Sequence, residues 1–577
     1  MDSLHAGREL DLYCPGHPVD CLPITTMLIA TLLTSATLLT PVLVSGPGAT
    51  ATVDDPLSHG TVGDNALSLD EAIRIANGSL SLASLSTQEQ ARLSGAGAVT
   101  TIRIDAAVTP SITVQAPLTD VVGQGMAVGR ICIEGVAAQG ARPVLDGGAV
   151  AHVLSLTRHL VTVSGIRFEG GDVAIVAQMP MMMMSMSQMP MVMGCEFDRQ
   201  NVYGVELLAT GMEETMLMVR DSQFTDMPVG FRLDETTTDG RIMCTGENLS
   251  FDGVDIGCDA FEGGNGMQTM FALWRSTFIN GARLGRATRS TASTKLFMFR
   301  LVYVDAVCSD HVVECIGSDN NNTMVHHHHG DWTAGPGKYA LYTHPRTAQF
   351  DVHGSEMVFH SDILIEANTA SARIWHQNNH YDNVTVTFDC DGALPNLVWN
   401  RYDNCDIQVG PLARSPVDIR MSELVDTTCS SQSFLAPLKL SGCYRSGGGL
   451  SGFATESLPA PQQMLSATAV SPREPLAGGD VTLAGVNPSG VAMAWVFADS
   501  FARPNTSQEP VRYYGDPATA IALPVVVAFQ SSLTVPIPAV TSLIGLEFYA
   551  QGVAFPMFGQ SYIPAYYLPR GERITIR

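Results

Sequence analysis

The sequence predicts an all-β protein whose central part is a solenoid of short, stacked parallel strands. An aromatic residue that follows an alternating strand recurs with a mean spacing of 26 residues through the middle of the chain. In seven of ten repeats the second residue after the aromatic is Gly, Asp or Asn, types that tolerate the left-handed backbone of a tight turn. Hardly any helical periodicity interrupts these repeats. The ten aromatic residues are Phe168, Phe197, Phe224, Phe251, Phe278, Tyr303, Trp332, Phe359, Tyr381 and Tyr402.

One repeat of this length cannot bury its own apolar face, whereas stacked repeats bury it jointly. Coils stacked ~4.8 Å apart place the aromatic residues in one internal column and the turn residues at one corner. We expect this solenoid over residues 99–445. A leucine-rich repeat is excluded by the missing L-x-x-L-x-L pattern, and a propeller by the short period. The seven turn residues are Gly170, Asp226, Gly253, Asn280, Asp305, Asn383 and Asn404.

The start of the chain predicts export. Residues 24–44 are apolar and uncharged, and Ala49 and Ala51 follow with the small-x-small pattern of a signal-peptidase site. We therefore expect residues 1–51 to be a signal peptide, with a long polar start or a true start at Met27. Because the segment is long enough to cross a bilayer, an uncleaved anchor is the competing interpretation. The expected location is secreted or cell-surface, with no integral membrane domain after cleavage.

Residues 52–98 are expected to cap the N-terminal end of the solenoid. Within Leu67–Asn77, Ser68 and Glu71 form the capping box that starts a short helix. The apolar residues on one face of this helix are Leu69, Ala72, Ile73 and Ala76. Such a face is suited to cover the open end of a stack of coils.

The composition changes after the last repeat. Residues 446–463 are rich in Gly, Ser and Pro and predict a linker. Beyond them, runs such as DVTLAG, VAMAWVFA and IGLEFYAQG alternate or are fully apolar, which predicts short strands. Residues 464–577 are therefore expected to form a small β-sandwich-like module. Its expected role is attachment, sorting or capping of the solenoid.

The repeats resemble the right-handed parallel β-helix, or pectate-lyase-like, superfamily over about Val99–Gly442. The run LSLDEAIRIAN is similar to the helix that opens many bacterial surface β-helix proteins, although Asp70 stands where arginine is usual. The runs SLTVPIP and LIGLEFYAQ resemble a C-terminal all-β module of secreted bacterial proteins. The resemblance implies a right-handed parallel β-helix. Enzymes of this fold use calcium-binding acids with a basic residue, or clustered aspartates; neither motif is identified here, so the catalytic residues stay unknown.

Charge and cysteines limit the function classes. With 32 basic and 56 acidic residues the net charge is −24, which argues against a nucleic-acid partner. Ten cysteines lie between Cys132 and Cys443, and three pairs are 14 or 15 residues apart. In an oxidising compartment each pair would form a local disulfide; buried thiols in a large core are the alternative. The three pairs are Cys244 and Cys258, Cys390 and Cys405, and Cys429 and Cys443.

Nine of the 15 histidines lie between His326 and His380. Counted back from the aromatic residue of each coil, His326 is equivalent to His353, and His329 to Glu356. Neighbouring coils then bring each pair about one strand spacing apart, where such groups bind a divalent metal or share a proton. The alternative is a solvated polar ladder. The candidate ligand-binding residues are His326, His329, His353, Glu356 and His376, with His326 and His353 as candidate metal ligands and calcium as a candidate cation.

A second unusual segment, Met179–Met193, contains nine methionines. Thioethers bind Cu(I), which suggests a copper-handling loop. Methionine also fills irregular core gaps, and Pro180 and Pro190 indicate a loop that bulges between coils. The sequence leaves both interpretations open.

Two functions from different classes fit these features. In the first, a monomeric surface protein uses the rigid face of the solenoid for adhesion or glycan binding, without catalysis. In the second, an extracellular polysaccharide lyase or glycoside hydrolase acts in a groove along the solenoid. An enzyme needs converging carboxylates, or an arginine beside an acid-bound cation. A binding protein needs only aromatic and polar rows on a flat face.

Overall fold

The structure is a computed structural model that describes most of the chain from Gly48 onward. The described residues are 48–122, 130–157, 160–179, 189–209, 214–235, 241–262, 268–289, 296–316, 322–344, 349–367, 373–377, 379–391, 394–398, 400–420, 422–441, 443–457, 468–472, 475–485, 491–498, 521–522, 532–556, 566–567 and 572–577. The apolar segment 24–44 and most of Met179–Met193 lie outside these residues. Among the described residues, no helix is long and apolar enough to cross a membrane.

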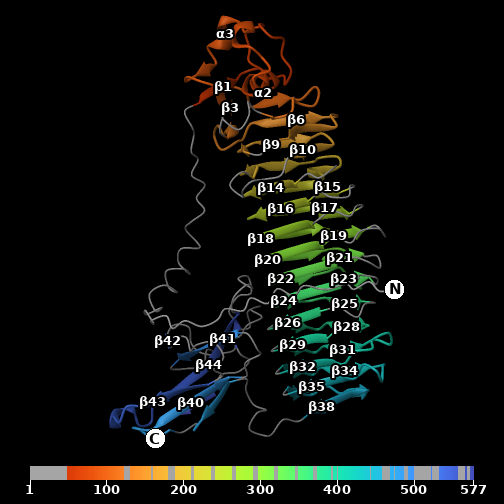
Figure 1. The fold of residues 1–577 in the computed structure, drawn as a ribbon, viewed down its shortest axis with the longest axis vertical. Coiled ribbons are helices and arrows are strands. Elements are labelled where there is room, and N and C mark those ends of the chain that lie inside the picture. Colours follow the sequence, from red (N-terminus) through yellow and green to blue (C-terminus); the bar gives the residue numbers. More distant parts are fainter. Residues whose placement is uncertain are drawn as a thin grey trace, which may run out of the picture. The chain divides into compact units, whose positions relative to one another are not determined.

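Strands β1 to β38 form stacked coils that are joined into one hydrogen-bonded network (Figure 1). Each coil contributes up to three strands, and each strand except β2, which pairs antiparallel with β1, pairs in parallel with the strand of the next coil, so three ladders run along the stack. The fold is therefore an all-β parallel β-helix, as the repeat predicts. Side chains alternate along each strand, so every second residue points into the tube. Inward-pointing residues at equivalent positions of successive coils form one buried apolar column.

The three ladders have the following strands. The first ladder comprises β1 (Ala49–Val53), β3 (Val99–Asp105), β5 (Ile131–Val136), β8 (Val161–Ser164), β11 (Met191–Met193), β14 (Glu214–Arg220), β16 (Arg241–Glu247), the first parts of β18 (Gln268–Gly281), β20 (Leu296–Cys308), β22 (Asn322–Thr333) and β24 (Gln349–Phe359), then β26 (Arg373–Gln377), β29 (Leu394–Val398), β32 (Val417–Arg420), β35 (Leu438–Ser441) and β38 (Ala454–Ser457). The second comprises β4 (Ser111–Thr113), β6 (Val144–Gly148), β9 (Arg167–Gly170), β12 (Glu196–Asp198), the first parts of β15 (Gln223–Glu235) and β17 (Ser250–Glu262), the second parts of β18, β20, β22 and β24, then β27 (His380–Asp382), β30 (Arg401–Asp403), β33 (Glu423–Val425) and β36 (Tyr444–Ser446). The third comprises β7 (His152–Leu156), β10 (Val173–Ala177), β13 (Tyr203–Ala209), the second parts of β15 and β17, then β19 (Arg283–Arg289), β21 (Val313–Ile316), β23 (Tyr339–His344), β25 (Asp362–Ala367), β28 (Thr385–Cys390), β31 (Asp406–Val409), β34 (Thr428–Ser431) and β37 (Leu450–Gly452).

The predicted aromatic column lies inside the second ladder. Nine of the ten rings are fully buried, and rings of successive coils stack at centroid distances such as 4.6 Å for Phe197 and Phe224 and 4.6 Å for Tyr381 and Tyr402. Offset-stacked aromatic pairs of this kind add about 0.5–1.5 kcal/mol beyond the apolar area that they bury. The column is therefore both the centre of the core and the feature that aligns the coils.

Tyr303 was predicted in this column, and that prediction is wrong. The register places Ala306 between Phe278 and Trp332 instead. The small Ala306 leaves room for the indole of Trp332, whose Nε1–H donates to the Val304 carbonyl oxygen at 3.0 Å. Tyr303 lies at the corner between the first and second ladders, with φ 55° and a 52% exposed side chain.

The predicted turn column forms the corner that follows the aromatic residues. Six of its seven residues have positive φ, between 52° and 69°, namely Gly170, Asp226, Gly253, Asn280, Asn383 and Asn404. Asp305 is not among the residues with positive φ. Asn, Asp and Gly recur here because the corner requires a left-handed backbone that other residues adopt only at a cost.

The N-terminal cap contains the predicted helix. Helix α2 (Leu69–Asn77) begins at Ser68, whose hydroxyl accepts from the Glu71 backbone N–H, while Glu71 accepts from the Ser68 backbone N–H. The four predicted apolar residues are fully buried in the core of the solenoid. Burial raises the pKa of Glu71, partly offset by these hydrogen bonds. The remaining elements of the cap are β2 (Leu93–Ser94), η2 (Leu82–Ser84) and α3 (Thr87–Gln90).

Both ends of the solenoid extend past the boundaries that the sequence predicts. At the start, β1 pairs with β3 and contains Ala49 and Ala51, so cleavage after Ala51 would divide a strand of the first ladder. At the end, β37 and β38 pair with β34 and β35, within the predicted linker 446–463. Glycine and serine contribute backbone groups to a ladder as readily as apolar residues, which is why composition alone misplaces this boundary.

The C-terminal region forms two antiparallel sheets. One sheet contains β39 (Thr468–Ser471), β40 (Asp480–Gly485) and β43 (Ser532–Pro536). The other contains β41 (Val491–Ala498), β42 (Ile521–Ala522), β44 (Glu547–Pro556), β45 (Tyr566–Tyr567) and β46 (Glu572–Thr575), and η5 (Thr541–Leu543) precedes β44. Antiparallel pairing distinguishes these strands from the parallel ladders of the solenoid.

The ten cysteines from Cys132 to Cys443 are all reduced thiols, and nine of them are buried. The disulfide alternative is therefore wrong, and the buried-thiol alternative is confirmed. Burial raises the pKa of Cys195 to about 11 and that of Cys308 to about 12, so these thiols stay protonated near neutral pH. A protonated, buried thiol is a poor nucleophile, which protects it from oxidation.

Candidate functional site

The histidine-rich segment lies on β22, where successive side chains point alternately into and out of the tube. Val325 and His327 are fully buried among the core, whereas His326 between them is partly exposed on the outer face. A shift of one position along the strand therefore decides whether a histidine side chain faces solvent or packs in the core. We call the outward side of the first ladder its outer face, and the inward side its inner face.

Three consecutive coils bring His326, His353 and Trp375 into one row on the outer face. The register pairs His326 with His353 and His353 with Trp375, which confirms the predicted equivalence of the two histidines. The rings stack almost in parallel, with centroid distances of 4.6 Å and 5.1 Å and interplanar angles of 10° and 6°. The three rings therefore form a continuous stack along the first ladder.

A second ring pair lies at the corner beside this row. His329 has φ 49° and stacks on Tyr303 of the preceding coil at 4.3 Å and 1°. His329 was predicted to neighbour Glu356; the backbone of Glu356 lies in β24, and its side chain is outside the described residues. The structure therefore stacks His329 on the aromatic ring of Tyr303. Strict counting of residues missed it because Tyr303 had been assigned to the core.

His376, another candidate, lies on the inner face. Its side chain is fully buried, its Nδ1 lies 2.6 Å from the Tyr381 hydroxyl, and its ring meets that of His327 edge-on at 5.2 Å. Burial lowers the pKa of His376 to about 3 and that of His327 well below its usual value. Both rings are therefore neutral core residues near neutral pH. Gly354 lies between them in the column, and a Cβ there would meet the His327 ring at 2.1 Å.

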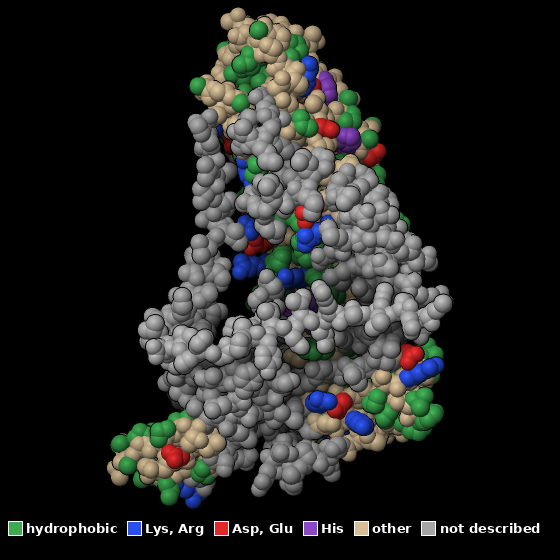
Figure 2. All heavy atoms as spheres, viewed as in Figure 1, with side chains coloured by type: hydrophobic (Ala, Val, Ile, Leu, Met, Phe, Trp, Pro, Cys, Tyr) green, Lys and Arg blue, Asp and Glu red, His purple; other side chains and the backbone are tan. Residues whose placement is uncertain are grey.

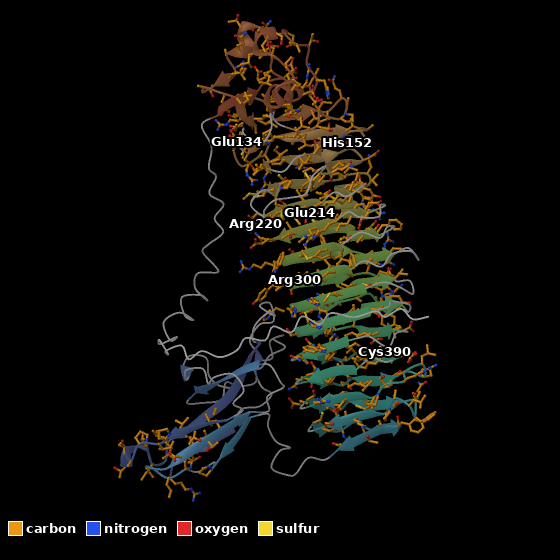
Figure 3. All side chains as sticks on the ribbon, in the orientation of Figure 1. Glu134, His152, Glu214, Arg220, Arg300 and Cys390 are labelled. Atoms are coloured by element: carbon orange, nitrogen blue, oxygen red, sulfur yellow. The ribbon has the colours of Figure 1, made fainter. Side chains whose placement is uncertain are left out.

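Charged and aromatic side chains lie on the outer face in the coils that precede the row. Figure 3 shows Arg220 and Arg300 on the same side of the stacked strands. The Arg300 guanidinium lies 5.5 Å from the ring centroid of Trp274, and Arg220 pairs with Glu247 at 2.8 Å. Figure 2 shows basic and acidic side chains beside one another on one face of the solenoid, with hydrophobic atoms between them. The face is therefore mixed in polarity and rich in rings.

The second ladder carries a charged network that the sequence analysis did not single out. Asp403 accepts from His380 Nε2 at 2.8 Å and from Arg401 Nε at 2.6 Å. Burial opposes ionisation of Asp403, but these two hydrogen bonds outweigh it and lower its pKa to about 2. The sequence signal for this network was the spacing of one coil, 21 residues from His380 to Arg401 and 23 residues from His380 to Asp403.

Metal binding by the histidine row alone is limited by its geometry. Within the part of the chain that the structure describes, no group of three or more His, Cys, Asp or Glu side chains is placed to hold a metal ion. The His326 and His353 rings face each other, so their nitrogens do not converge on one point. The metal and calcium predictions stay predictions.

Comparison with known proteins adds no closer assignment. No protein-family model matches the chain, and no curated protein sequence matches it either. The assignment to a parallel β-helix therefore depends on the ladders themselves, and function has to be argued from the outer face.

Proposed function

We propose that the chain is a non-catalytic binding protein, secreted or held at the cell surface, whose solenoid presents the outer face of the first ladder to a glycan. The observation that carries the proposal is the row of His326, His353 and Trp375, stacked in register on three consecutive coils. Parallel pairing and a filled core hold this row rigid, so binding costs little conformational entropy.

The chemistry of the row suits a polymer of hydroxyl groups. A neutral imidazole offers one nitrogen as donor and one as acceptor, and an indole offers a single N–H donor. Sugar hydroxyls both donate and accept, and a repeating polymer presents equivalent groups at regular intervals. Arg300, one coil before His326 in the same column, adds charged donors at one end of the row.

Of the two enzyme alternatives, a glycoside hydrolase needs a carboxyl group that keeps a proton near neutral pH. On the third ladder, Asp259 lies between Arg232 and Arg286, with N–O distances of 2.6 Å and 2.8 Å. Burial raises the pKa of Asp259, but the two arginines outweigh it, so the net shift is downward. Such an arginine-paired carboxylate favours a structural role for Asp259 over that of a general acid.

The test is a pull-down against a polysaccharide panel, with and without calcium, in which unsaturated products and reducing ends are measured in parallel. We expect retention on at least one glycan without cleavage. The double variant His353→Ala/Trp375→Ala should lose most of this retention, whereas Thr387→Ala on the third ladder should keep it. Cleavage would establish the enzyme alternative, and full retention by the double variant would refute the proposed face.

A further inference from the structure

Five methionines form a single column on the outer face of the first ladder. The register pairs each with the next over five consecutive coils, in the order Met216, Met243, Met270, Met298 and Met324. The spacing along the chain is 26 to 28 residues, one coil each time. The column begins where Met179–Met193 ends, since Met189 packs against its first two members.

The column is not an extension of the core. Met189, Met216 and Met243 are 2%, 3% and 7% exposed, and with Met218 and Met270 they form a cluster separate from the main core. A second pair, Met191 and Met218, lies in the neighbouring outward column. The thioethers are therefore gathered together on the outside of the tube, and Met189, Met216 and Met243 are buried there.

The residue type is specific to this position. The inward-facing columns on either side hold Leu217, Cys244, Phe271, Phe299 and Val325 in one case and Thr215, Ile242, Thr269, Phe297 and Thr323 in the other, with no methionine among them. On these coils of the first ladder methionine therefore lies in the outward columns, while the methionines of the main core, Met179, Met227 and Met357, lie elsewhere.

We propose that this column binds a soft monovalent metal ion, Cu(I) or Ag(I), through thioether sulfurs of adjacent coils. Thioethers are among the ligands that select Cu(I). Parallel coils lie ~4.8 Å apart, and a linear sulfur–metal–sulfur unit spans about twice a metal–sulfur bond of ~2.3 Å. Neighbouring methionines in register therefore match a two-coordinate site, and a third sulfur from Met189 or Met218 completes a trigonal one.

The surroundings support a soft cation over a hard one. The column contains no oxygen or nitrogen ligand over its five coils and reaches Asp351 only after Met324. Calcium and magnesium require oxygen ligands, so this column cannot serve them. The inference is independent of the proposed glycan face, because its five methionines lie in a different column from His326, His353 and Trp375; of the proposed ligands, only Met218 shares their column, four coils before His326.

The experiment replaces sulfur without changing bulk. Met→Leu exchanges in a packed site usually cost less than about 1.5 kcal/mol each, so the ladder variant, Met216→Leu/Met243→Leu/Met270→Leu/Met298→Leu/Met324→Leu, should stay folded. Circular dichroism and the thermal midpoint verify this. The matched control Met227→Leu/Met357→Leu changes two methionines of the main core. Binding is measured with Ag(I) by calorimetry, and with Cu(I) by competition against a chromogenic chelator under anaerobic ascorbate.

We expect the wild-type chain and the core control to bind, and the ladder variant to bind at least ~100-fold more weakly, since losing a single outer-shell partner already weakens metal binding ~10–100-fold. Thiols are the competing soft ligand, and Cys132, two coils before Met191 in the same outward column, is the partly exposed one. Cys132→Ser should therefore leave the binding unchanged. Absence of binding by the wild-type chain, or unchanged binding by the ladder variant, would refute the proposal.

Discussion

Neighbouring histidines have opposite environments on the inner and outer faces of the first ladder. His326 lies outside, partly exposed, in a stacked row with His353, whereas His327 lies inside with both ring nitrogens lacking a hydrogen-bond partner. The same residue type, one position apart, thus forms part of a binding surface on one side and of the core on the other. Strand parity, more than residue type, decides the role of a side chain in this fold.

The largest expected effect is the loss of an internal ring. Phe251 stacks between Phe224 and Phe278 at 5.0 Å and 6.0 Å and is fully buried. Phe251→Ala should lower the free energy of unfolding by about 3–5 kcal/mol, because it removes apolar contacts and leaves a cavity. Tyr303→Ala, at the exposed corner, should cost less than about 1 kcal/mol. Urea denaturation of both variants measures the two losses in the free energy of unfolding. Equal losses would contradict the distinction between inward-facing and exposed side chains.

The next effect concerns acid sensitivity. Because the folded-state pKa values of His327 and His376 are lowered, the unfolded chain binds more protons below its own pKa of ~6.5. Their contribution to stability is complete above pH 6.5 and is lost progressively as the pH falls toward about 3.

His327→Leu tests this directly. Leucine occupies the equivalent position at Leu301, and removing an unsatisfied buried polar ring should raise stability by about 1–3 kcal/mol at pH 7. The variant should also lose less stability than the wild-type chain between pH 6.5 and pH 4, as measured by urea midpoints. An unchanged pH slope would show that His327 titrates normally and lies outside the core.

The sequence predicted the parts of the fold that follow from repetition. The aromatic spacing and the turn residues after it identified the coils, because each coil needs one large internal side chain and one left-handed corner. The same counting placed His326 beside His353. It failed at Tyr303, which lies at the corner, while the column position of that coil is occupied by Ala306, a residue that the search for aromatic side chains passed over.

The candidate site was only partly predictable. Counting residues from one aromatic to the next identified which residues are neighbours on adjacent coils. It did not show which side chains of a strand point into the tube and which point out of it. His376 points into the tube and is therefore a core residue. The methionine column was present in the sequence as a spacing near 27 residues from Met189 to Met324. The sequence analysis considered only the dense run Met179–Met193, as a single loop, and not this regular spacing.

The smallest expected effect is the pH dependence of the stability contribution of His360, which has the opposite sign to that of the buried histidines. His360, on the second ladder, lies between Asp331 and Asp382, with Nε2–Oδ1 and Nδ1–Oδ2 distances of 3.4 Å and 3.6 Å. The hydrogen bond with Asp331, with further support from Asp382, raises its pKa despite partial burial. Its contribution to stability is therefore complete below pH ~6.5 and is lost as the pH rises through the raised folded-state value.

His360→Gln should destabilise the chain by less than about 1 kcal/mol at pH 5.5, because partly exposed ion pairs are weak, and by still less at pH 8.5. Urea midpoints at the two pH values give the comparison. A larger loss at pH 8.5 than at pH 5.5 would contradict the ion-pair interpretation.

Histidine modification by diethyl pyrocarbonate, located by tandem mass spectrometry of the native chain at pH 7, tests the central claim most directly. The reagent attacks neutral imidazole, and the buried rings are neutral at this pH, so protection reports burial and not protonation. We expect His353 to be modified readily, whereas His327 and His376 react only after unfolding in urea. Equal native-state rates at His353 and His376 would contradict the alternation of inner and outer faces on which the account depends.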